Sequence, residues 1–166
     1  MIKASLVSLL VLLTLGSAET QTRLGGCARG SEQGYVRVTE NDHLRFWRGG
    51  DRAVAVEPGD ELRLCRFERD NAVVTLGALG VGFTVPRASV SSEIIQPTVR
   101  EVTPQDVACV GPQIEALREG RNSNEQNFAL LDLSRRLDIS LPMIYQIRLR
   151  SAMLLPEQIP ACEQTD

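Results

Sequence analysis

The sequence predicts an α+β protein, in which a small antiparallel β-barrel is followed by a three-helix, disulfide-tied C-terminal region. Before about residue 100, short strand-like runs are separated by frequent turn signals, as is typical of a barrel or sandwich. After it, capping sequences and helical periodicity take over. We expect a signal peptide at 1–18, a β-barrel domain at 19–100 and a helical region at 101–166.

The first 18 residues have the features of a cleavable secretory signal peptide. Lys3 gives a basic start, residues 4–15 are mostly apolar, and Gly16, Ser17 and Ala18 are small residues that suit signal peptidase. The apolar run is shorter than the roughly 20 residues that a membrane-spanning helix needs. The sequence therefore predicts a secreted or periplasmic protein with no transmembrane segment after cleavage. An uncleaved anchor is the alternative.

The charge balance argues against a nucleic-acid partner. The chain has 18 basic and 21 acidic residues and a formal net charge of −3. Affinity for nucleic acids depends on clustered cations that neutralise phosphates. We therefore expect no nucleic acid among the partners.

The chain has four cysteines, Cys27, Cys65, Cys109 and Cys162, and their spacing favours disulfides. An even number of cysteines in an oxidising compartment indicates bridges, and none of the spacings resembles the close pairs of a zinc site. Three pairings are open, and free thiols are a further alternative. We favour Cys27–Cys65 with Cys109–Cys162, because each bridge then closes within one half of the chain.

Six strand-like segments precede residue 100. Alternating apolar residues, β-branched residues or both mark each of them. The segments are residues 35–38, 44–47, 52–56, 62–64, 73–76 and 81–85. Glycine, proline or acidic residues between them predict turns, most strongly at the Pro-Gly-Asp of residues 58–60.

The first predicted helix begins with Thr103 as N-cap, a proline in the first turn and Asp106 three residues after the cap. Pro112 is expected to interrupt or restart this helix, because proline lacks an N–H and its ring clashes with the preceding turn. Gly120 is a natural stop.

Two further helices follow. A capping box at 123–126 predicts a helix that runs to Leu137. The third helix is predicted to start at Pro142 and to reach about Leu154, before two further prolines end it.

Two stretches, 54–64 (VAVEPGDELRL) and 81–90 (VGFTVPRASV), resemble Src-homology-3-like barrels, including those of bacterial exported proteins. In that family the first holds a hydrophobic pair, a Gly-Asp at the diverging turn and a strand. The second holds the last hairpin strand and a short helical turn that begins at a proline. The resemblance covers residues 35–90, and it implies a binding module without a cofactor rather than a catalyst.

Peptide-binding members of that family line their groove with tyrosines, a tryptophan and a proline. Tyr35 and Pro86 match two of these positions, but the tryptophan position holds Ala72 or Val73 and the closing tyrosine is Ser89. Because two aromatic walls are missing, we do not expect a proline-rich ligand. The resemblance leaves peptidoglycan or an envelope protein as the expected partner.

Phe46 and Trp47 complete the candidate ligand-binding set with Tyr35 and Pro86. Adjacent residues on a strand face opposite sides, so one ring is expected in the core and the other nearer the surface. Tryptophan is enriched at binding hot spots. The alternative is that both rings only cover a small core.

Residues 133–148 resemble a helix-turn-helix, with Ser140 in the place of the recognition-helix cap. The usual small alanine is Ser134, however, and the usual turn glycine is Asp138. We interpret this segment as a plain helical hairpin, and a DNA-binding protein is the least favoured hypothesis.

The sequence offers no recognisable catalytic or metal site. A serine or cysteine nucleophile would need the only histidine, His43, as its base, and no Gly-x-Ser-x-Gly motif accompanies it. We expect His43 in a surface loop. The favoured function is a non-catalytic binding or assembly module of the cell envelope or secreted space, and a small exported hydrolase is the alternative.

Overall fold

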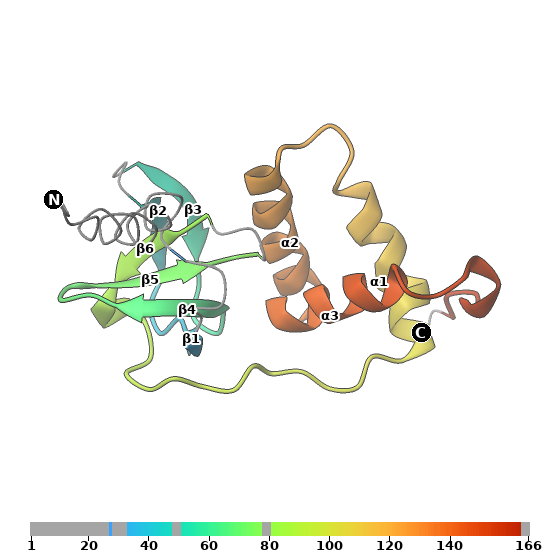
Figure 1. Ribbon diagram of the computed structural model, residues 1–166, viewed down its shortest axis with the longest axis horizontal. Helices are drawn as coiled ribbons and strands as arrows, with labels where there is room; N and C mark the ends of the chain where they lie inside the picture. The colour runs from blue at the N-terminus through green and yellow to red at the C-terminus, as the bar shows by residue number, and fades with distance from the viewer. Residues whose placement is uncertain (1–26, 28–32, 48–50, 78–80, 164–166) are drawn as a thin grey trace, which may run out of the picture.

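The computed structural model describes residues 27, 33–47, 51–77 and 81–163. The predicted signal peptide at 1–18 lies outside these residues. An antiparallel six-stranded sheet comes first and three α-helices follow, so the predicted α+β class and the order of its two regions are confirmed (Figure 1).

The bounds of the elements are close to those expected. The strands are β1 (Gly34–Arg37), β2 (Asp42–Phe46), β3 (Arg52–Val56), β4 (Glu61–Phe67), β5 (Asn71–Thr75) and β6 (Phe83–Pro86). The helices are η2 (Arg87–Ser89), α1 (Pro104–Ala116), α2 (Ser123–Leu137), α3 (Leu141–Ser151) and η3 (Pro156–Gln158), of which η2 and η3 are short 3-10 turns.

The sheet does not close into the barrel that the sequence predicts. Its strand order is β1-β4-β5-β6-β2-β3, and within the described ranges β1 and β3 remain unpaired with each other at the two edges. The chain after β6 returns to the β1 side instead, through bridges from Val90 to Val38 and from Ile95 to Tyr35. Because this segment occupies the β1 edge, that edge is not available to β3.

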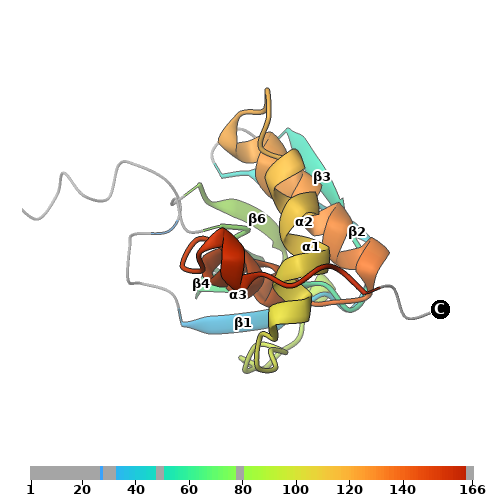
Figure 2. The same ribbon diagram turned by 90° about the vertical axis from the view of Figure 1, so that its right-hand side faces the viewer.

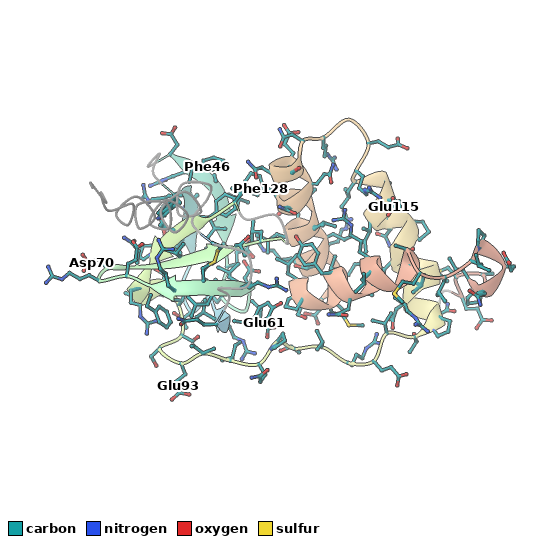
Figure 3. All side chains as sticks on the ribbon, in the orientation of Figure 1. Phe46, Glu61, Asp70, Glu93, Glu115 and Phe128 are labelled. Atoms are coloured by element: carbon teal, nitrogen blue, oxygen red, sulfur yellow. A yellow bond between two sulfur atoms is a disulfide. The ribbon has the colours of Figure 1, made fainter. Side chains whose placement is uncertain are left out.

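The buried side chains of the sheet and of the helices form one continuous cluster. The fully buried ring of Phe83 lies at its centre, with ring centroids 5.4 Å from Phe46 on the sheet and 5.8 Å from Phe128 on α2. Figure 3 labels Phe46 and Phe128 on the facing sides of the two regions. Burial of apolar area, the main stabilising term in folding, therefore couples the sheet to the helices.

Arg135 of α2 makes polar contacts between the same regions. Its guanidinium donates to both carboxylate oxygens of Asp60, at 3.1 and 2.6 Å, and to the Ala55 carbonyl at 2.9 Å. Asp60 belongs to the turn between β3 and β4, and its side chain is only 6% exposed. Seen from the outer side of the helices, the bundle covers one end of the sheet (Figure 2).

Helix α1 begins as predicted but does not break at Pro112. Thr103 and Asp106 form the expected capping box, and the helix then runs unbroken to Ala116. Val110 and Ile114, on either side of Pro112, are buried in the common core. This tertiary packing outweighs the roughly 3 kcal/mol that a proline costs inside a helix.

Helices α2 and α3 differ from the prediction only at their ends. The cap of α2 is Asn122, paired with Glu125, so the capping box lies one residue earlier than expected. Asp138 ends α2 in the left-handed conformation (φ 52°), and Ser140 caps α3. Helix α3 stops at Ser151, before the expected Leu154.

Both disulfides of the favoured pairing are present. Cys27 is bonded to Cys65, with Cα atoms 5.4 Å apart, and Cys109 to Cys162, with Cα atoms 4.8 Å apart. A bulge in β4 between Leu64 and Arg66 allows Leu64 and Cys65 to be buried together. Over the part of the chain that the structure describes, no helix has the length and apolar character required to cross a membrane.

The cap of α1 should make stability depend on acid pH. Two hydrogen bonds from Arg100, each 2.6 Å long, together with bonds from the Thr103 N–H and hydroxyl, lower the pKa of Asp106 to about 2 although partial burial opposes the shift. A lowered pKa stabilises the fold above the unfolded value near 3.8, and this contribution is lost as the pH falls towards 2. Because Arg100 is mostly exposed and its charge is screened by solvent, we expect these interactions to contribute about 1 kcal/mol to the free energy of unfolding.

Urea unfolding at pH 5, 3 and 2 tests this expectation. Asp106→Asn should be less stable than the wild type at pH 5, and the difference should shrink by pH 2. Asp70→Asn, in an exposed turn, is the control and should follow the wild type at every pH. A difference between Asp106→Asn and the wild type that stays constant over this range would contradict the assignment.

Candidate functional site

A cleft of about 440 Å³ lies between the sheet and helices α2 and α3. We call it the sheet–helix cleft. The sheet side contributes Tyr35, Glu61, Arg63, Thr75, Leu76 and Gly77. The helix side contributes Ser123, Gln126, Asn127, Leu141, Pro142, Tyr145, Gln146, Arg148, Leu149 and Ala152.

The sheet wall is a row of three residues on adjacent strands. Strand register places Tyr35 of β1 opposite Arg63 of β4, and Arg63 opposite Thr75 of β5. Side chains directly opposite each other on paired strands share one face of the sheet. The Arg63 guanidinium donates to the Tyr35 hydroxyl at 3.3 and 3.4 Å, and its carbon lies 5.7 Å from the centroid of the Tyr35 ring.

The helix wall is built around Tyr145 of α3. Its hydroxyl donates to the Asn127 side-chain oxygen of α2 at 3.0 Å. Burial raises the pKa of Tyr145 well above its usual value, although the nearby charges of Arg148 and Arg63 oppose the shift. The hydroxyl therefore stays neutral and keeps its hydrogen-bonding capacity at physiological pH.

Gly77 allows Asn127 to lie against the sheet. A Cβ atom at residue 77 would be 2.8 Å from the Asn127 side-chain oxygen, closer than such contacts occur. A side chain at residue 77 would displace the amide of Asn127, so the hydrogen bond between Asn127 and the Tyr145 hydroxyl depends on Gly77.

The acidic residue of the cleft, Glu61, has its carboxylate already satisfied. The side chain is 3% exposed, and its oxygens accept from the Arg37 guanidinium at 2.9 Å, from the Thr98 N–H at 2.7 Å and from the Thr98 hydroxyl. Figure 3 labels Glu61 at the end of the sheet that faces the helices. A buried carboxylate with three donors is a structural anchor, because its charge is already compensated.

Glu61 and Ser140 hold the segment that joins the two regions. Residues 91–103, which we call the strap, run in extended form along one side of the molecule (Figure 1). The Ser140 hydroxyl donates to the Thr98 carbonyl, while Thr98 donates to Glu61. Thr98 thus connects β4 to the start of α3, and it fixes the spacing of the two cleft walls at this end.

The structure does not bring the four candidate ligand-binding residues together. Tyr35 lines the cleft, whereas Phe46 packs on Phe83 in the common core. Trp47 packs on a separate small cluster that contains the Cys27–Cys65 disulfide. Pro86 ends β6, away from the cleft lining. Phe46 and Trp47 do lie on opposite sides, as expected for neighbours on a strand, and both are half-buried.

Most residues of the helix wall were not singled out from the sequence. Tyr145 and Arg148 lie three residues apart on one helix, and that spacing places them on one face. An aromatic residue and a cation on one helical face were therefore the signal in the sequence that could have indicated this wall. The sequence did not reveal that this face would meet Arg63, since their approach depends on the packing of α3 against the sheet.

His43 lies in strand β2, so the prediction that it lies in a surface loop is wrong. Pairing with Ala55 of β3 extends the strand to this residue. The adjacent Asp42 accepts from the Ser89 hydroxyl at 2.6 Å and from the His43 N–H at 2.7 Å. Burial by itself raises the pKa of Asp42, but these two hydrogen bonds outweigh it, and the pKa is lowered. Ser89 is thus hydrogen-bonded to a carboxylate, not to the imidazole.

Comparison with family models, with curated proteins and with solved structures finds no match to the chain. Within the described ranges, no cluster of three or more histidine, cysteine, aspartate or glutamate side chains is placed to hold a metal ion. All four cysteines are in disulfides.

Proposed function

We propose that this protein is a non-catalytic binding or assembly module of the cell envelope or secreted space, and that its ligand enters the sheet–helix cleft. The observation that carries the proposal is the pair of facing walls, Tyr35 with Arg63 and Tyr145 with Asn127. Binding sites for small ligands are typically concave, about 300–1,000 Å³ in volume, and lined by apolar and aromatic groups with a few convergent polar ones. The cleft has this size and composition.

A secreted or periplasmic location is part of the proposal. The signal-like residues 1–18 support it. The two disulfides add support, because such bonds persist in oxidising compartments. Peptidoglycan or an envelope protein is the expected partner in that setting.

The proposal also includes a relation between the sheet and Src-homology-3-like barrels. Support comes from the turn at residues 57–60 before β4 and from the 3-10 turn η2 directly after Pro86. Ligand binding on such barrels is a property of surfaces and grooves, which agrees with a module that recognises rather than transforms its partner.

Retention on purified peptidoglycan and on immobilised envelope proteins tests the proposal. Ala152→Trp places a large ring in the cleft lining at an exposed position just after α3. It should reduce retention at least tenfold. Met153→Trp adds the same ring next to it, at a residue that is 67% exposed and outside the lining, and should leave retention unchanged.

Two results would contradict the proposal. One is failure of the wild type to be retained on either matrix. The other is equal retention of Ala152→Trp and Met153→Trp, which would place any binding outside the cleft.

A further inference from the structure

The charge of the sheet–helix cleft is opposite in sign to that of the whole chain. The chain carries a formal net charge of −3, yet the lining includes the cations Arg63 and Arg148 against the acid Glu61. Glu61 is already compensated by Arg37 and Thr98. The lining residues thus carry one positive formal charge in excess, and clefts lined mainly by one sign of charge raise the local concentration of counter-ions.

The two arginines approach the cleft from opposite walls. Arg63 comes from β4 and Arg148 from α3, and both lie close enough to the Tyr145 hydroxyl to influence it. The ion pairs found among the described residues do not include Arg148. Its guanidinium thus keeps its charge available to a ligand.

Arg63 is already oriented before any ligand binds. The Tyr35 hydroxyl and ring hold its guanidinium on the sheet wall. A planar guanidinium presents paired N–H groups that match the two oxygens of a carboxylate. Orientation in advance reduces the entropy that is lost on binding.

The rest of the lining suits a peptide. The Gln146 side-chain amide provides a donor and an acceptor, as a peptide backbone requires. The Gln126 amide nitrogen donates to the backbone carbonyls of Arg118 and Arg121, so this side chain contributes its oxygen as an acceptor. Leu141 and Leu149 provide apolar contact, and Leu149 is 58% exposed at the edge of the cleft. Amides, apolar surface and a pair of cations together match a short chain that ends in an anion.

Building on the proposed function, we infer that the ligand is a short peptide with a free carboxylate, which binds between Arg63 and Arg148 of the sheet–helix cleft. Such carboxylates occur on the peptides of peptidoglycan and at the C-terminus of an envelope protein. The chemistry of recognition is the same for both sources.

Surface plasmon resonance with two immobilised peptide pools tests the inference. Both pools contain pentapeptides of alanine, glycine, leucine and serine in random order, attached through the N-terminus. One pool ends in a free carboxylate and the other in a carboxamide. The wild type should bind the carboxylate pool at least tenfold more tightly than the amide pool, because a charge-assisted hydrogen bond is about twice as strong as a neutral one.

Arg148→Gln should weaken binding to the carboxylate pool about tenfold or more and should weaken binding to the amide pool by a much smaller factor, so that the preference for the carboxylate is lost. Arg150→Gln is the matched control, since Arg150 lies on the same helix, is exposed and is not part of the cleft lining. It should change either affinity by less than twofold. Competition with soluble fragments of digested peptidoglycan or with free L-peptides distinguishes the two sources of carboxylate.

Several outcomes would overturn the inference. Equal binding of the two pools, with both blocked by Ala152→Trp, would reject the carboxylate but preserve a cleft that binds ligands. Binding of neither pool, alongside cleft-dependent retention on peptidoglycan, would reject a short peptide. Displacement of the carboxylate pool by inorganic phosphate at equal affinity would indicate a general anion site. If Ala152→Trp changed neither the binding of the pools nor the retention on peptidoglycan and envelope proteins, the proposed function itself would be contradicted.

Discussion

Replacing Phe83 with alanine should lower the free energy of unfolding by about 3–5 kcal/mol, the usual cost of removing a buried aromatic ring. The Phe83 ring is fully buried and contacts Phe46 and Phe128, so its loss leaves a cavity between the sheet and the helices. Urea unfolding, followed separately in the two regions, measures the effect. Trp47 is the only tryptophan and its fluorescence reports on the sheet, while far-ultraviolet circular dichroism reports mainly on the helices.

Because Phe83 stabilises both regions, the two signals should change together at a lower urea concentration. Phe67→Ala is the control, since this β4 side chain is only half-buried and should cost less. A double-mutant cycle of Phe83 with Phe128 should give a coupling energy of about 0.5–1.5 kcal/mol. Additive effects, or a shift in the fluorescence transition alone, would contradict the common core.

Replacing Arg135 with methionine should lower the free energy of unfolding by about 2–4 kcal/mol. The change leaves the Asp60 carboxylate buried without its cation, and removing one partner of a buried pair is costly for this reason. Methionine has a similar length and keeps the apolar stem of the side chain. Urea unfolding at pH 7 measures the loss.

Arg136→Met is the matched control, because Arg136 is the next residue of α2 and is exposed. It should change the free energy of unfolding by less than about 0.5 kcal/mol, as most surface substitutions do. Combining Arg135→Met with Asp60→Asn should recover part of the loss, since the unpaired charge is then removed. A loss in Arg135→Met as small as that expected for Arg136→Met would show that the pair contributes no net stability.

Local signals in the sequence predicted the elements well where neighbouring residues decide the structure. The Thr103–Asp106 capping box, the turn at residues 57–60 and the strand alternation around Leu62 and Leu64 all act within a few residues. The same locality explains the error at Pro112. The unfavourable effect of proline inside a helix is local, but the compensating burial of Val110 and Ile114 depends on distant parts of the chain.

The open sheet and the cleft depend on long-range contacts, so the sequence did not predict them. The bridge from Tyr35 to Ile95 occupies the edge that a closed barrel would need. The cleft requires Arg63 and Arg148 to meet across two regions of different structure. Tyr35 alone was both singled out from the sequence and found in the cleft, while Phe46 and Trp47 have structural neighbours that their residue types do not reveal.

The two disulfides join the cysteines in the order in which they occur along the chain, first with second and third with fourth. A polypeptide that emerges from a translocation channel N-terminus first exposes Cys27 and Cys65 before Cys109. An oxidant that pairs thiols as they appear would then form the native bonds directly. On the proposed export route, no later exchange through a mixed disulfide is needed, and formation of the two native bonds requires no disulfide isomerase.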